Sequence, residues 1–79
     1  MNKLISLDKL PIGKSAIVKK LHNQGIVRRR LLDLGLIEGT RVRALMRSPA
    51  GDPTAYDIRG AVIALRKEET SKILVEQLD

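Results

Sequence analysis

The sequence predicts a mainly β fold in which about five short strands accompany a single α-helix. Short segments with β-branched or alternating apolar residues recur along the chain, glycines and prolines separate them, and only one segment has helical apolar spacing. With 79 residues and no linker-like stretch, the chain is expected to form one domain over residues 1–79. A domain this small leaves little room for an elaborate active site.

The first expected elements are a short helical turn and a strand. Residues 6–10 are predicted to form the turn, which Pro11 ends because a residue before proline avoids the helical region. Gly13 is expected to turn the chain into a strand over residues 15–21, where β-branched residues favour an extended backbone.

Residues 24–34 have the apolar spacing of an α-helix. The expected stripe at i, i+4 and i+7 consists of Val27, Leu31 and Leu34. Ile26 lies beside this stripe and widens it. We therefore expect the helix to pack on the core along its length.

Both ends of this helix carry capping signals. Asn23 is the expected N-cap, and Gly35 is expected to be the left-handed residue that stops the helix. In that arrangement Leu36 should contact Leu31, as the Schellman motif requires. Gly39 then marks a tight turn into the next strand.

Residues 40–48 are predicted to form a strand with one buried and one basic face. The buried face is expected to contain Val42, Ala44 and Met46. The basic face is expected to contain Arg41, Arg43 and Arg47. Leu45 breaks the alternation, and three interpretations of it stay open: a scattered surface residue, part of a docking patch, or a bulge that turns it inward.

The remaining elements are three strands and one helical turn. We expect strands over residues 54–59, 61–65 and 73–78, a bend at Gly60 and one turn of helix over residues 66–71. Five short strands hide their edges best when the sheet closes on itself. The expected architecture is therefore a small SH3-like barrel with the helix on one side.

The positive charge is concentrated in the first half of the chain. Residues 1–37 contain eight lysines and arginines against two acids, whereas residues 38–79 contain seven of each, so the net charge of +6 lies in the first part. Such asymmetry favours an anionic partner. Arg28 and Arg29 of the helix either face solvent or dock an acidic surface, and the Arg43–Leu45–Arg47 face is a second candidate patch.

No pattern in the sequence indicates an enzyme. There is no cysteine, His22 is the only histidine, and no metal-ligand spacing or phosphate loop surrounds it. Because Tyr56 is the only aromatic residue, base stacking on single-stranded nucleic acid is poorly supported, although duplex contacts through phosphates stay open. With no apolar run near 18 residues and no signal-peptide pattern, the cytoplasm is the expected location.

The order of these motifs resembles the FeoA family of small companions of bacterial ferrous iron uptake. The resemblance starts at Leu10-Pro11-x-Gly13, continues through Leu31-Leu32-Asp33-Leu34-Gly35-Leu36-x-x-Gly39, and ends with Gly60 and the last strand. Two positions depart from the family pattern: Glu38 stands where proline is frequent, and Thr70 or Ser71 where a small residue is common.

The resemblance implies an SH3-like barrel and a non-enzymatic role. It implies docking on the FeoB membrane GTPase-permease, so that the chain would reach the membrane only through this partner. It assigns no metal ligands, although direct binding of ferrous or another divalent transition metal is an alternative. A homodimer through an apolar outer residue, a nucleic-acid-binding barrel and a domain like the C-terminal part of DtxR-type repressors are further alternatives.

Overall fold

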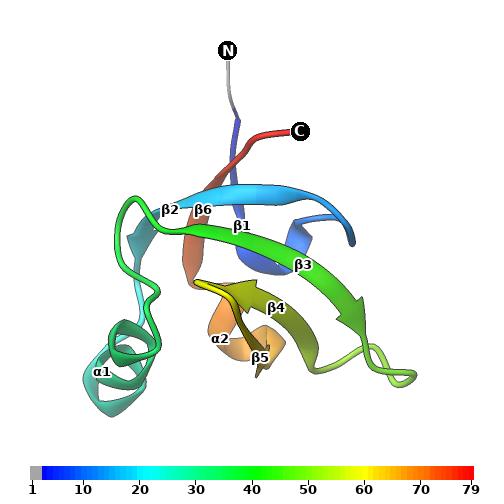
Figure 1. Cartoon of the computed structure of the whole chain (residues 1–79). Coiled ribbons are helices and arrows are strands. Elements are labelled where there is room, and N and C mark those ends of the chain that lie inside the picture. The colour runs from blue at the N-terminus through cyan, green and yellow to red at the C-terminus, as the bar shows by residue number, and fades with distance from the viewer. Residues whose placement is uncertain (1–2) are drawn as a thin grey trace.

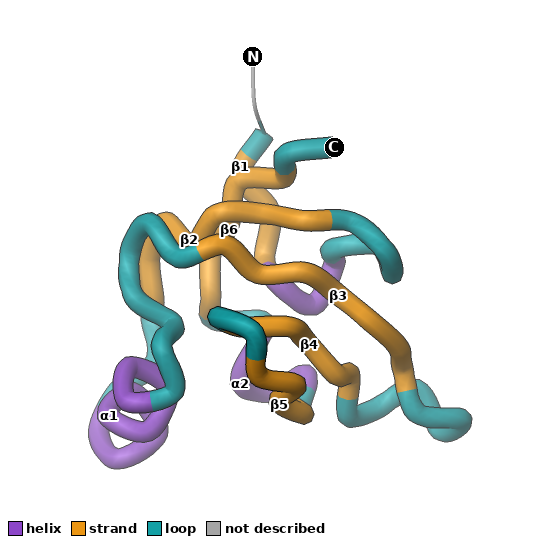
Figure 2. Tube along the Cα trace, viewed as in Figure 1, coloured by secondary structure: helices purple, strands orange, loops and turns teal. Residues whose placement is uncertain are grey.

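The computed structural model describes residues 3–79 and confirms the mainly β prediction (Figures 1 and 2). Its elements in order are β1 (Leu4–Ser6), the short 3-10 helix η1 (Leu7–Lys9), β2 (Ser15–Leu21), α1 (Gly25–Asp33), β3 (Arg41–Arg47), β4 (Thr54–Ile58), β5 (Ala61–Leu65), α2 (Lys67–Thr70) and β6 (Ile73–Gln77). The expected helical turns are η1 and α2. Strand β1 adds to the five strands expected from the sequence.

All six strands belong to one antiparallel sheet in the order β1-β6-β2-β3-β4-β5. The last strand of the chain, β6, lies between β1 and β2, so the first and last strands pair with each other (Figure 1). The sheet is strongly curved, and α1 stands beside it on two connecting loops (Figure 2). No helix in residues 3–79 combines the length and apolar character needed to cross a bilayer.

An aliphatic core fills the concave side of the sheet. The fully buried apolar side chains come from nearly every element: Leu7, Leu10, Ala16, Val18, Leu31, Leu36, Val42, Ala44, Ile58, Leu65, Ile73 and Val75. Each buried leucine or isoleucine stabilises the fold by about 1.5–3 kcal/mol relative to an exposed one. Tyr56 is the only aromatic member of this core.

The predicted stop of α1 is confirmed. The N–H of Leu36 donates to the carbonyl of Leu31 and the N–H of Gly35 donates to the carbonyl of Leu32, both over 3.0 Å. These are the two hydrogen bonds of a Schellman motif. Gly35 has a φ of 103°, a value that residues with a Cβ rarely adopt.

The packing of α1 differs from the prediction in two ways. Leu31 is buried and Leu34 packs on the core, but Val27 is 41% exposed and Ile26 is 87% exposed, so the packed stripe is shorter and narrower than expected. Leu31 is the one buried residue of α1, so the apolar side chains near the start of the helix stay exposed. In addition, Gln24 is the N-cap, and Asn23 instead donates from its side-chain amide to the carbonyl of Glu69, 3.0 Å away.

A β-bulge changes the facing of β3. Ala44 lies opposite Tyr56 and Met46 lies opposite Ala55, so Leu45 is the extra residue on its strand. One extra residue reverses the alternation that follows it. Met46 is consequently 64% exposed, and its predicted place on the buried face is wrong. Leu45 itself is half-buried, as the bulge interpretation expects.

Candidate functional site

The three adjacent arginines of α1 have different environments. Arg28 donates from Nη1 to the carbonyl of Leu21 at the end of β2, 2.7 Å away. Arg30 forms an ion pair with Glu69 near the end of the barrel. Arg29 is exposed, and its side chain has no partner among residues 3–79. Two of the arginines therefore attach α1 to the barrel, and Arg29 is presented to solvent.

The structure does not bring Arg43, Leu45 and Arg47 onto one face. Arg43 is exposed opposite Asp57, on the outer side of the sheet. After the bulge, Arg47 lies opposite the buried Thr54, on the other side. The sequence pattern predicted one face for these residues because a simple alternation does not account for the bulge at Leu45.

The outer face instead gathers three arginines that line one hollow of about 310 Å³. Arg41 and Arg43 belong to β3, and Arg59 belongs to the turn after β4. Asp57 is the only acid that lines the hollow. The hollow therefore carries a net positive charge, which suits an anionic group. The sequence interpretation named Arg43 here but missed Arg59. The strand register is the signal that finds it, because Val42 pairs with Ile58, and Arg41 and Arg59 are the neighbouring residues just beyond that pair.

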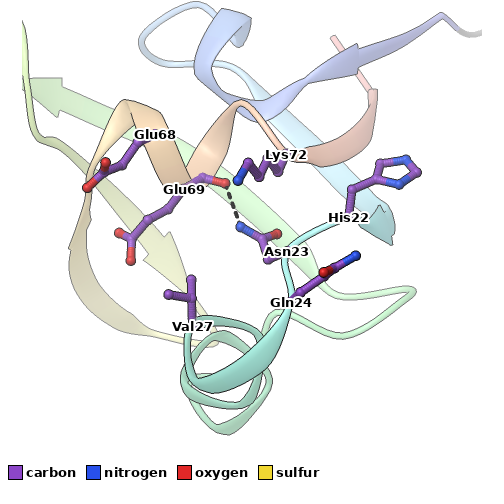
Figure 3. A pocket seen from close by; sticks show the side chains of 7 residues that line it. All are labelled: His22, Asn23, Gln24, Val27, Glu68, Glu69 and Lys72. Carbon is purple, nitrogen blue, oxygen red and sulfur yellow. Dashed lines mark hydrogen bonds between the residues drawn. The ribbon is translucent and has the colours of Figure 1, made fainter.

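A hollow of about 520 Å³ lies between the β2–α1 connection and α2 (Figure 3). It is lined by His22, Asn23, Gln24, Val27, Glu68, Glu69 and Lys72. Figure 3 shows the His22 ring pointing away from both glutamates. Within residues 3–79, no three histidine, aspartate or glutamate side chains gather in a way that could hold a metal ion. The hollow therefore offers mixed polar and apolar contacts.

Tyr56 is a buried titratable group whose pKa is shifted. Burial of its ring raises the pKa of the phenol above its ordinary value, since the phenolate would lose its hydration. The hydroxyl donates to the carbonyl of Leu7 over 3.5 Å. The phenol is therefore neutral at physiological pH and belongs to the packing of the barrel.

The glycines of the sequence motif form turns. Positive φ values occur at Gly13, Gly35, Gly39 and Gly60. Together with the buried Leu31 and Leu36, these residues shape the scaffold that carries the arginines.

Comparisons with known proteins identify the scaffold. The model of the FeoA domain family matches residues 5–77. A curated relative, the Fe(2+) transport protein A/Fe(2+) transporter FeoB fusion protein of Porphyromonas gingivalis, is 31% identical over 70 residues. That match covers 89% of this chain but 8% of the fusion protein.

Two solved structures resemble the fold closely. The FeoA-like protein of Clostridium acetobutylicum has a TM-score of 0.89 and 37% identity, over 100% of this chain and 92% of that chain. The zinc complex of Stenotrophomonas maltophilia FeoA, described as a prokaryotic SH3 domain protein, has a TM-score of 0.73 and 32% identity, over 95% and 88% of the two chains. The expected SH3-like architecture is confirmed, and the chain belongs to the FeoA domain family.

Proposed function

We propose that this chain is a non-enzymatic accessory protein of bacterial ferrous iron uptake that docks on the cytoplasmic part of a FeoB-type GTPase-permease. The observation that carries the proposal is the fusion relative, in which a segment similar to this chain is joined to an Fe(2+) transporter. Joining two domains in one chain holds them at an effective concentration near the millimolar range. A fusion of this kind is therefore expected of domains that work in contact.

The charge distribution supports a docking role. Arg29 extends from α1, and Arg41, Arg43 and Arg59 lie together on the outer face. Exposed cations of this kind speed the encounter with an acidic surface and orient it, more than they strengthen the final complex. Of the residues proposed from the sequence, Arg29 and Arg43 are the best placed. Arg28 also holds α1, and Leu45 and Arg47 lie at or beyond the bulge.

The proposed location follows from the proposed partner. A chain that binds the GTPase domain of the permease would work in the cytoplasm, at the inner face of the membrane, and would reach the membrane only through the permease.

Binding to the permease tests this function directly. The cytoplasmic domain of the FeoB-type permease from the same organism is titrated with the chain by calorimetry, without nucleotide and with GDP or a non-hydrolysable GTP analogue. We expect saturable binding in at least one state. We also expect Arg29→Glu together with Arg43→Glu to weaken it by about tenfold, since each reversal replaces attraction by repulsion.

A cellular measurement completes the test. Deletion of the gene is expected to lower uptake of radioactive Fe(II), and the wild-type gene should restore it. Absence of binding in every nucleotide state, combined with normal uptake in the deletion strain, would contradict the proposed function.

A further inference from the structure

Strand β5 is an open edge of the sheet. It pairs with β4, and no strand within residues 3–79 pairs with its other side. The two-residue turn of Arg59 and Gly60 joins the strands, so Ile58 and Ala61 form the hydrogen-bonded pair that closes the hairpin. Alternation along the ladder then directs the N–H and C=O groups of Val62 and Ala64 away from β4. Four backbone groups are thus presented at this edge.

The side chains of β5 do not protect that edge. Proteins commonly guard an exposed edge strand with lysine, proline or an inward-pointing charge. The sequence Ala61–Leu65 contains none of these, and Val62 is 71% exposed. An unguarded apolar edge in a native protein is the kind of edge to which an extended segment adds as another strand.

An apolar row leads across the outer face to this edge. Met46, Ala55 and Ala64 lie side by side on β3, β4 and β5. Together with Pro49, Pro53, Arg47 and Ser48 they line a hollow of about 260 Å³. A strand added to β5 would place an apolar side chain beside Ala64, at the open end of the row. The outer face therefore offers apolar contact next to the free backbone groups.

The charges around β5 define what the edge can accept. The exposed Arg59 and Arg66 lie just beyond its two ends, and Arg66 forms an ion pair with Asp52 at 3.9 Å. A second copy paired antiparallel about Ile63 would set its Lys67 against Arg59, and this repulsion disfavours self-association. A segment with acidic residues at its ends would instead face a cation at each end.

We propose that β5 accepts an extended segment of the permease, apolar in its centre and acidic at its ends, which adds to the sheet as a seventh strand. This strand addition rests on the proposed docking of the chain on the permease, and it identifies β5 as the docking surface. Backbone hydrogen bonds at Val62 and Ala64 supply the pairing, the Met46–Ala55–Ala64 row supplies the apolar contact, and Arg59 and Arg66 supply the charge pairing.

Amide hydrogen exchange tests the pairing itself. The full chain is measured by NMR alone and with the cytoplasmic domain of the permease. The amides of Val62 and Ala64 are expected to exchange rapidly in the free chain and to slow by at least about tenfold in the complex, as they gain hydrogen bonds. The amides of β1, at the opposite edge, should keep their rates.

Matched variants separate this surface from the docking in general. Val62→Pro removes an N–H that β4 does not use, and Val62→Lys adds an edge charge while keeping the backbone. Both are expected to weaken binding by about tenfold. Leu4→Lys makes the same change on the exposed side of β1 and should bind like the wild type. Circular dichroism checks that each variant is folded.

Each result decides one question. Normal binding by Val62→Lys, with unprotected Val62 and Ala64 amides, would overturn the β5 surface and leave the docking intact. No binding by the wild type would overturn both. Protection of the same amides in a concentrated solution of the chain alone would identify a second copy as the occupant and would also overturn the proposal.

Discussion

The burial of Tyr56 affects both the packing of the core and the pKa of its phenol. Its ring is almost fully buried, and its hydroxyl lies 3.5 Å from the carbonyl of Leu7. Because burial raises the pKa of the phenol, the folded chain holds the proton more tightly than the unfolded chain does. The phenol thus contributes stability while it is neutral.

The pH dependence of stability follows from this shift. Above about pH 10 the unfolded chain loses the phenolic proton while the folded chain keeps it, so the free energy of unfolding falls until pH passes the raised pKa. Denaturant unfolding at pH values from neutral to strongly alkaline measures the fall. Tyr56→Phe should lack this contribution, and an identical fall in that variant would contradict the assignment to Tyr56. As Tyr56 is the only tyrosine, phenolate absorbance reports its titration directly.

Helix α1 shows how a short element can be held by a few contacts. Within the helix only Leu31 is buried, and the Arg28 side chain ties the helix to the last carbonyl of β2. An isolated helix of nine residues is not stable in water. Its order therefore depends on these tertiary contacts.

Replacing Arg28 and Arg29 separately tests the role of the tie. Arg28→Ala removes a charged hydrogen bond of 2.7 Å and should lower the free energy of unfolding by about 1 kcal/mol or more. Arg29→Ala removes an exposed side chain and should change stability by less than about 0.5 kcal/mol. Thermal unfolding measures both, and amide exchange in α1 should accelerate only for Arg28→Ala. Equal effects would refute the separate roles.

The elements that local chemistry dictates were predictable from the sequence. The Gly35 stop of α1 and the alternating residues of β4 need no distant partner for their interpretation. Strand β1 was missed because three residues carry almost no pattern and form a strand only by pairing with β6. Likewise, the apolar spacing that includes Ile26 predicts a helix but does not show which part of that helix the barrel covers.

The candidate site was less predictable because it depends on register. Arg41 and Arg59 are distant in sequence and meet only through the β3–β4 pairing. The difference between Arg28 and Arg29 rests on a carbonyl in another element. Composition indicated a basic docking protein. The three-dimensional arrangement was needed to tell which cationic side chains are not engaged by other parts of the chain.

At the scale of the whole molecule, the net charge of +6 governs how a partner is approached. Exposed charges act over about 10 Å at 0.1 M salt and over less at higher salt. Association with an acidic partner should therefore slow as salt increases, while dissociation changes little.

Kinetics at several salt concentrations measure this effect. Between about 0.05 and 0.5 M salt, the association rate with the permease domain should fall by about tenfold. The Arg29→Glu, Arg43→Glu double variant should show a shallower dependence. A rate that is independent of salt in the wild type would contradict electrostatic approach.

The bulge at Leu45 reverses which side of the sheet the following residues of β3 face. Residues 41, 43 and 47 share odd numbers, yet the first two belong to one side of the sheet and the third to the other. Deleting Leu45 would restore the regular alternation of β3. Met46 would then turn inward and Arg47 would move to the outer side. A single-residue deletion could therefore exchange an apolar outer contact for a cation without any substitution.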